Sequence, residues 1–296
     1  MSLSRRRFLA VAAACAATGG QAAVPHRWRG RALGAEAEIV VHGPAASAQA
    51  ALAAARERIA AVEAEFNLYD PASSLSRLNR DGRLEPLPAL WGPLISTIDQ
   101  VHRVTGGLFD PTVQSVWPTL ARGQRPQDRS IMGWHRVQIV HNRITLKPGQ
   151  AMTFNGIAQG YATDLVAQTL REHGFDQTLG NIGEYRGAGE DWKIGISDHR
   201  LGLVGYRTLR DGALATTSPG ALTFATGQSH VIHPQGAEQP LLWSTVTVEA
   251  EPAILADAMS TALALSDLPL IHQVRADLPA LRRVTLIDDR GDLITV

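Results

Sequence analysis

Hydrophobic and polar positions recur with two periodicities along the chain, and each periodicity predicts one kind of element. Apolar residues spaced three and four apart predict helices at 48–66, 90–104, 157–173 and 252–265, with a short helical turn at 73–76. Alternating or short apolar runs predict strands at 32–41, 137–140, 143–146, 192–196, 203–209, 213–216, 230–233, 243–248, 283–287 and 293–296. Strands and helices do not alternate regularly, and no repeat or linker divides residues 23–296. The pattern therefore predicts one α+β domain with mixed or antiparallel sheets and packed helices, not a doubly wound parallel sheet.

The first 22 residues have the character of an export signal. Arg5, Arg6 and Arg7 precede a short apolar run at 11–17, and Gly20-Gln21-Ala22 offers a cleavage site of small residues. Paired arginines before Phe-Leu are typical of the twin-arginine signal, although an ordinary secretory signal remains an alternative. We expect residues 1–22 to be removed, with the mature protein in the periplasm.

Membrane attachment of the mature chain is not expected. The apolar run is too short for a span of about 20 residues, so no transmembrane segment is predicted. Cys15 follows alanines and lacks the leucine of a lipidation signal, which makes lipid anchoring there a disfavoured alternative.

Composition narrows the function classes. The chain has 45% apolar residues and equal numbers of basic and acidic residues, 28 each, which is globular composition. A net charge near zero argues against nucleic acid as a partner, because such binders carry a basic surplus. The single cysteine excludes a disulfide scaffold and a cysteine-based zinc site.

Two segments contain residues suited to binding phosphate and metal. In the segment 154–164, Gly156 and Gly160 lie at the predicted start of a helix, where free N–H groups suit an anion; a plain strand-to-helix turn is an equal alternative. In the segment 256–261, Asp257 and Thr261 are four apart on a predicted helix and share one face. A carboxylate and a hydroxyl are hard oxygen ligands for Mg²⁺, but Asp257 alone is more often a helix-dipole residue.

Two further segments are informative only in combination. Ser229-His230-Val231-Ile232-His233-Pro234 reads as a strand, which would point His230 and His233 apart and makes zinc unlikely. The segment 106–113 combines a glycine pair, an aromatic residue and an Asp-Pro turn, which fits a binding loop or a plain helix stop equally well.

Taken in order, these segments resemble the ApbE family of exported FAD:protein FMN transferases. The resemblance covers residues 33–265, and a NosX-like group with twin-arginine signals is its best fit. The matching segments are 69–79, 105–113, 155–164, 181–183, 215–218, 229–234 and 244–263.

The resemblance implies a T-fold-related domain, a flavin site and a metal site. FAD as substrate would contact Leu33, Leu108, Phe109, Asp110, Thr153, Gln159 and Ile232. Mg²⁺ would be held by the side chains of Asp257 and Thr261 and the carbonyl of Gly156.

The resemblance also implies a reaction. A Ser or Thr hydroxyl of an exported or membrane-bound acceptor, an electron-transfer protein, would receive FMN from FAD, and AMP would leave. His230 and Asp257 are the catalytic candidates, His230 because an imidazole can move a proton near neutral pH.

Four positions depart from the family pattern. Thr153 stands where an Asp is common, Gln159 where a Lys or Glu is frequent, and His233 where Asp is usual. Ser260 occupies the place of a second acidic metal ligand found in some members, which leaves less negative charge for Mg²⁺. Two alternatives therefore stay open: hydrolysis of FAD to FMN and AMP, and a carrier that binds FAD without turnover.

Overall fold

The computed structural model describes residues 24–236 and 241–296, so the predicted signal peptide lies outside the described residues. The strands are β1 (Pro25–Ala32), β2 (Ala35–His42), β3 (Arg83–Leu84), β4 (Gln138–Val140), β5 (Arg143–Thr145), β6 (Thr178–Asn181), β7 (Tyr185–Ala188), β8 (Trp192–Asp198), β9 (Gly202–Leu209), β10 (Gly212–Thr217), β11 (Trp243–Ala250), β12 (Leu281–Asp288) and β13 (Leu293–Thr295). The α-helices are α1 (Ala45–Phe66), α2 (Ser74–Asp81), α3 (Trp91–Val104), α4 (Trp117–Ala121), α5 (Ala158–Glu172), α6 (Ala253–Leu263) and α7 (Leu268–Asp277). Short 3₁₀ turns occur at Pro111–Ser115, Trp134–Arg136 and Pro219–Ala221.

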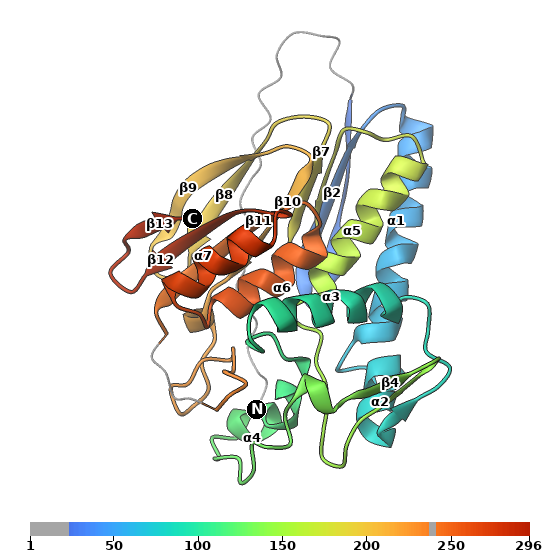
Figure 1. Ribbon diagram of the computed structural model, residues 1–296. Coiled ribbons are helices and arrows are strands. Elements are labelled where there is room, and N and C mark those ends of the chain that lie inside the picture. The colour runs from blue at the N-terminus through green and yellow to red at the C-terminus, as the bar shows by residue number, and fades with distance from the viewer. Residues whose placement is uncertain (1–23, 237–240) are drawn as a thin grey trace.

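A twisted eight-stranded sheet forms the centre of the molecule (Figure 1). Its strand order is β1-β2-β6-β7-β10-β11-β12-β13, and every neighbouring pair is antiparallel. A three-stranded sheet, β3-β5-β4, and the two-stranded β8-β9 sheet are separate from it. The α+β prediction is confirmed.

Alternation along the central strands gives the sheet two covered faces. Ile39 and Val41 of β2 join the large core beneath the helices, whereas Val40 between them joins a smaller cluster with Trp192 of β8 and Leu214 of β10. Because successive side chains of a strand point to opposite faces, β8-β9 covers the face that the helices leave. Helices α5 and α6 lie side by side on the helical face.

Four aromatic rings join the helices to the segment that precedes α5. The ring of Phe154 packs edge-on against Phe66 of α1, with centroids 5.4 Å apart, and against Trp91 of α3 at 5.3 Å. Tyr161 of α5 lies 6.3 Å from the Phe66 ring. Phe154 is 1% exposed, so this packing fixes the chain just before Gly156.

One strand prediction was wrong, and another strand begins three residues later than predicted. The strand predicted at 32–41 is β2 alone, because Leu33 and Gly34 have φ of 48° and 81° and form the hairpin turn from β1. Positive φ at both turn residues is the geometry that joins two-residue hairpins. The segment 230–233 is a loop instead of a strand, fixed by local bonds such as that from the Val231 amide to Ser229 Oγ.

The other predicted helices and strands are confirmed within a few residues at their ends. Six elements were not predicted: β1, β3, β6, β7, α4 and α7. Strand β1 alternates between exposed and half-buried positions at the sheet edge, and β6 and β7 are only four residues long. Formation of such strands depends on packing against neighbouring strands more than on their own hydrophobic pattern.

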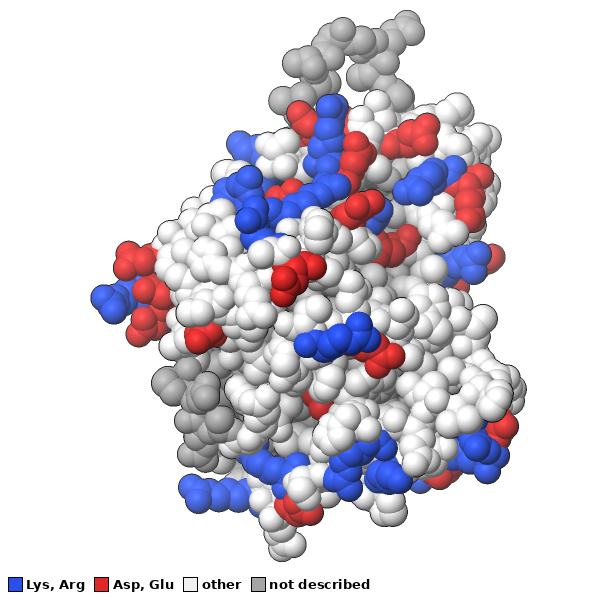
Figure 2. Space-filling model, viewed as in Figure 1, with Lys and Arg blue, Asp and Glu red and all other residues white. Residues whose placement is uncertain are grey.

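No helix among residues 24–236 and 241–296 is long and apolar enough to cross a membrane. On the face drawn in Figure 2, basic and acidic side chains are interspersed and no broad area carries one sign.

Candidate functional site

The amides at the start of α5 and of α6 each donate hydrogen bonds to an aspartate of the other helix. Asp257 of α6 accepts a 2.8 Å hydrogen bond from the amide of Gly160 in the first turn of α5. Asp164 of α5 accepts bonds of 2.9 Å from the amides of Ala253 and Ile254, which begin α6. Each carboxylate thus satisfies amides that the opposite helix leaves unpaired, and each lies at a positive dipole end.

Glycine is required where the two helices meet. A Cβ at Gly160 would lie 2.3 Å from the carbonyl oxygen of Ala253 and 2.7 Å from Cβ of Asp257. A Cβ at Gly156 would lie 2.7 Å from Oγ1 of Thr261. The three residues that the resemblance assigns to a metal, Gly156, Asp257 and Thr261, are therefore brought together from two segments about 100 residues apart in the chain.

These three residues present donors that suit a hard cation. They offer a carboxylate, a hydroxyl and a main-chain carbonyl, which are oxygen ligands that Mg²⁺ accepts, and Gly156 keeps the space beside Thr261 open. Within the described residues, no group of three or more His, Cys, Asp or Glu side chains gathers as a metal site. A metal here would have one carboxylate and two uncharged oxygens as protein ligands, and its other positions would be open to water or to phosphate oxygens of a ligand.

The turn before α5 is less open to anions than the sequence suggested. The amides of Ile157, Ala158 and Tyr161 donate to carbonyls within the turn, and that of Gly160 donates to Asp257. Most N–H groups of this helix start are thus already paired. The turn therefore offers few free N–H groups to an anion.

Burial makes the Asp257 carboxyl unusually basic. The side chain is 3% exposed, and this burial raises its pKa to about 7, against the opposing effect of the Gly160 amide. A carboxylate at this position needs a positive charge nearby, which a divalent cation would supply.

The loop at 108–113 is tied to the segment before Gly156. The amide of Thr153 donates to the carbonyl of Pro111 at 2.9 Å, which brings Leu108, Phe109 and Asp110 to the Thr153 side of the turn. The Asp110 carboxylate accepts from the amides of Thr112 and Trp134 at 2.8 and 2.9 Å. Its side chain thus holds the loop together, a structural role that the sequence did not reveal.

The loop at 218–236 carries the candidate residues His230 and Ile232. His230 Nδ1 lies 2.9 Å from the carbonyl of Leu222, so the tautomer that donates this bond has its proton on Nδ1 and its lone pair on Nε2. Ile232 is 8% exposed and packs in a cluster with Val116, Leu120, Met132 and Phe224. Gln235 donates to the carbonyl of Gly106 at 3.0 Å, which ties this loop to the 106–110 segment.

Leu33 lies apart in the β1–β2 turn, where its amide donates to Glu63 of α1 at 2.7 Å. Its side chain packs against the large hydrophobic core, which also contains Leu108 and Phe109. Its role toward FAD stays a prediction.

The four departures from the family pattern have distinct surroundings. Thr153 Oγ1 accepts from the amide of Asn155, and the Gln159 side chain packs against Gly183. Ser260 is fully buried and its hydroxyl lies 2.8 Å from that of Thr217 on β10. Burial lowers the pKa of His233, whose Nδ1 is buried with no hydrogen-bond partner.

Sequence reasoning missed Asn79 and Glu184. The Asn79 amide pairs with both backbone groups of Met152, at 2.8 and 2.7 Å, and so holds the segment before Gly156 like a strand. Glu184 is a buried acid directly after the Asn181-Ile182-Gly183 match, but β6 and β7 on either side were not recognised. Asn79 ends one matching segment and Glu184 directly follows another, and these positions could have marked both residues as candidates.

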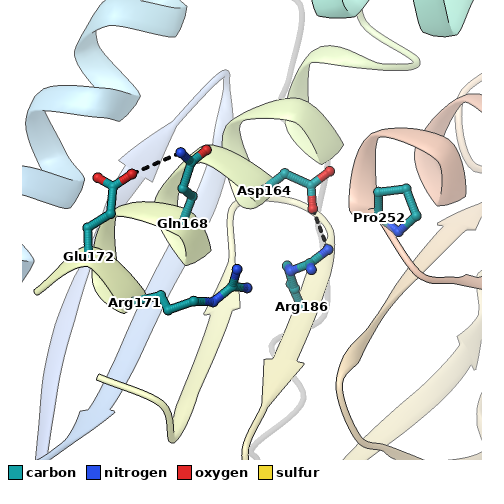
Figure 3. A pocket seen from close by; sticks show the side chains of 6 residues that line it. All are labelled: Asp164, Gln168, Arg171, Glu172, Arg186 and Pro252. Atoms are coloured by element: carbon teal, nitrogen blue, oxygen red, sulfur yellow. Dashed lines mark hydrogen bonds and ion pairs between the residues drawn. The ribbon is translucent and has the colours of Figure 1, made fainter. Parts of the chain in front are cut away.

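A separate hollow of about 480 Å³ lies on the outer side of the α5–α6 junction (Figure 3). Asp164, Gln168, Arg171, Glu172, Arg186 and Pro252 line it. Arg186 forms an ion pair with Asp164 at 2.6 Å, so the guanidinium charge is paired with the carboxylate that holds the start of α6. None of the predicted flavin contacts lines the hollow.

Comparison with known proteins gives a consistent family assignment. A model of the ApbE family matches residues 33–279. A Chlamydia muridarum protein named FAD:protein FMN transferase is 26% identical over 228 residues, covering 67% of this chain and 70% of that protein. The Pseudomonas stutzeri flavinyl transferase ApbE has a similar fold at 22% identity, with a TM-score of 0.79 over 92% of this chain and 94% of that one. An ApbE protein of Thermotoga maritima, at 24% identity, also gives 0.79, with 92% and 96% covered.

Proposed function

Because this chain belongs to the ApbE family, we propose that it transfers FMN from FAD to a Ser or Thr hydroxyl of an acceptor protein. The observation that carries the proposal is the meeting of Gly156, Asp257 and Thr261 at the α5–α6 junction. Relatives named FAD:protein FMN transferase support the same reaction class.

The transfer is a displacement at phosphorus. The acceptor oxygen attacks the phosphorus on the FMN side of the FAD diphosphate, a new P–O bond forms, and the P–O bond to AMP breaks. AMP leaves with the bridging oxygen, and His230 is the residue that we assign to take the proton of the attacking hydroxyl. Bound Mg²⁺ would offset the negative charge of the diphosphate.

The chain's own residues hold the reacting groups. Asp257 and Thr261 of α6, together with the main-chain carbonyl of Gly156, would bind the metal. Leu108, Phe109, Thr153, Gln159 and Ile232 would bind FAD, with Leu33 and Asp110 as the remaining predicted contacts. The 106–110 and 218–236 segments, joined by the Gln235–Gly106 bond, form the flavin side of the site.

Export belongs to the same proposal. The twin-arginine signal at 1–22 would place the enzyme in the periplasm, so the acceptor is an exported or membrane-bound electron-transfer protein.

Mixing the exported chain with FAD, Mg²⁺ and a candidate acceptor tests the reaction. AMP release and in-gel flavin fluorescence of the denatured acceptor are followed together, with Asp257→Asn as the variant that loses the metal-site charge. We expect both signals in the wild type, and a loss of at least about 100-fold in the variant, in the range expected when a metal ligand is removed.

The other outcomes identify the alternatives. AMP release without a labelled acceptor indicates hydrolysis of FAD. Binding of FAD without AMP, with or without Mg²⁺, indicates a carrier and contradicts the transferase.

A further inference from the structure

A second buried carboxyl group lies beside the proposed metal site. Glu184 precedes β7 and is 8% exposed. Its Oε2 accepts a 3.1 Å hydrogen bond from the amide of Thr216 on β10, and its main-chain carbonyl accepts from Thr163 Oγ1 of α5 at 3.3 Å. The side chain is therefore held between the end of β10 and the first turns of α5.

Two series of contacts through neighbouring residues link Glu184 to Asp257. Thr217, the neighbour of Thr216, lies 2.8 Å from Ser260 through the two hydroxyls, and Ser260 is three residues after Asp257 on α6. On the other side, the Gln159 side chain packs against Gly183, and the next residue, Gly160, donates to Asp257. Four elements from distant parts of the chain thus enclose both carboxyl groups.

Among the described residues, no lysine or arginine forms an ion pair with the carboxyl group of Glu184 or of Asp257. Burial, and next the charge of Asp257, raise the pKa of Glu184 well above its ordinary value. Two buried carboxylates are costly unless a positive charge is shared between them.

We propose that Glu184 supplies the second negative charge of the metal site, on the β7 side of Mg²⁺, by contacting the ion or one of its waters. The inference rests on the proposed function, because it assumes Mg²⁺ between Gly156, Asp257 and Thr261. It also accounts for Ser260: the charge missing at that position of α6 comes from the turn between β6 and β7. Glu184 acts as a positioning residue for the cation.

Metal affinity without FAD or an acceptor tests this assignment. Mn²⁺, which has a spectroscopic signal, is titrated into the exported chain and free Mn²⁺ is followed by electron paramagnetic resonance, with competition by Mg²⁺. Glu184→Gln keeps the shape and the acceptor atom for Thr216 while removing the charge. We expect Mn²⁺ binding roughly 10–100-fold weaker than in the wild type, as for residues that orient or support metal ligands.

Glu172→Gln is the matched control. It removes the same charge from the other end of α5, where the side chain is exposed and bonds only to Gln168. We expect wild-type affinity, within about twofold, because a surface charge at that distance is screened. Equal affinity of Glu184→Gln and the wild type would overturn the inference and leave the proposed metal site intact. Failure of the wild type to bind Mn²⁺ would overturn both.

A measurement on the unaltered chain covers the case in which Glu184→Gln does not fold. Fe²⁺ with ascorbate and peroxide cleaves a backbone close to the ion's position. Cleavage at 183–185, together with cleavage near Gly156 and Asp257, supports the proposal. Cleavage confined to the latter two segments contradicts it.

Discussion

Asp198 is a buried carboxylate that four hydrogen bonds keep ionised. It is 1% exposed and accepts from Ser244 Oγ, from Thr245 Oγ1 at 2.7 Å, and from the amides of Arg200 and Leu201 at 2.8 and 3.0 Å. Burial by itself would raise its pKa, but the bonds from Ser244 and Thr245 and the two amides outweigh burial and lower the pKa to about 2. The carboxylate therefore contributes stability above its unfolded pKa near 4 and loses it as pH falls toward 2.

We expect Ser244→Ala to destabilise the protein by about 1–3 kcal/mol at pH 7, since it removes a bond to a charged group. The difference from the wild type should shrink at pH 3, where part of the Asp198 population is protonated in the variant. Urea unfolding at the two pH values measures both quantities. A difference independent of pH would contradict the role of the Asp198 charge.

At Gly156 the absence of a side chain leaves room beside Thr261, one of the proposed metal ligands. Gly156→Ala would put a methyl group 2.7 Å from Thr261 Oγ1, so we expect Mn²⁺ affinity to fall by at least about tenfold, the lower end for disturbed metal sites. Gly92→Ala in α3 is the control, because nothing lies within 4 Å of its Cβ; it should leave Mn²⁺ affinity unchanged. Titration of the two variants side by side decides the prediction, and equal affinities would place the metal away from Gly156.

At the scale of elements, the reciprocal contact of α5 and α6 controls how Asp257 is presented. Asp164 holds the start of α6 and pairs with Arg186 of β7, while Asp257 on α6 holds the start of α5. A change at Asp164 therefore acts on the site through the helix that carries Asp257 and Thr261.

We expect Asp164→Asn to cost roughly 1–3 kcal/mol in the free energy of unfolding, because it weakens a helix cap and leaves the partly buried Arg186 with less compensation. Mn²⁺ affinity should fall as well, although Asp164 is not a proposed ligand. Urea unfolding and Mn²⁺ titration are the measurements. Lower stability with unchanged affinity would show that the start of α6 does not position the metal ligands.

At the scale of the whole molecule, the candidate site draws on elements spread over the chain. Asn79, the 152–160 segment, Glu184 and α6 come from four regions that meet on the helical side of the sheet. Occupation of the site should therefore stabilise the entire fold and not one lobe of it.

FAD at about 100 times its dissociation constant, added to protein already saturated with Mg²⁺, should raise the free energy of unfolding by about 2.7 kcal/mol above the value with Mg²⁺ alone. Calorimetry with each ligand alone and with both measures the shift. Unfolding in two separate transitions, of which only one moves, would contradict a site shared by the whole fold.

Local patterns were enough to establish the fold class, the four long helices and the order of the chemical segments. Long helices are readable because their buried residues recur locally, as Ala55, Ile59, Val62 and Phe66 do in α1. The motif matches also named Gly156, Asp257 and Thr261, whose juxtaposition the structure confirms; their metal role, and the FAD contacts, stay predictions.

The partners that each motif contacts across the molecule became known from the folded structure. The bond between Gly160 and Asp257 joins residues 97 positions apart, and no local pattern records such a partner. Strands β6 and β7 are too short to show a period, so Glu184 between them was overlooked, and the expected strand at 230–233 proved to be a loop. Periodicity reports which face of an element is buried, whereas a site is formed where several elements meet, and that meeting depends on packing along the whole chain.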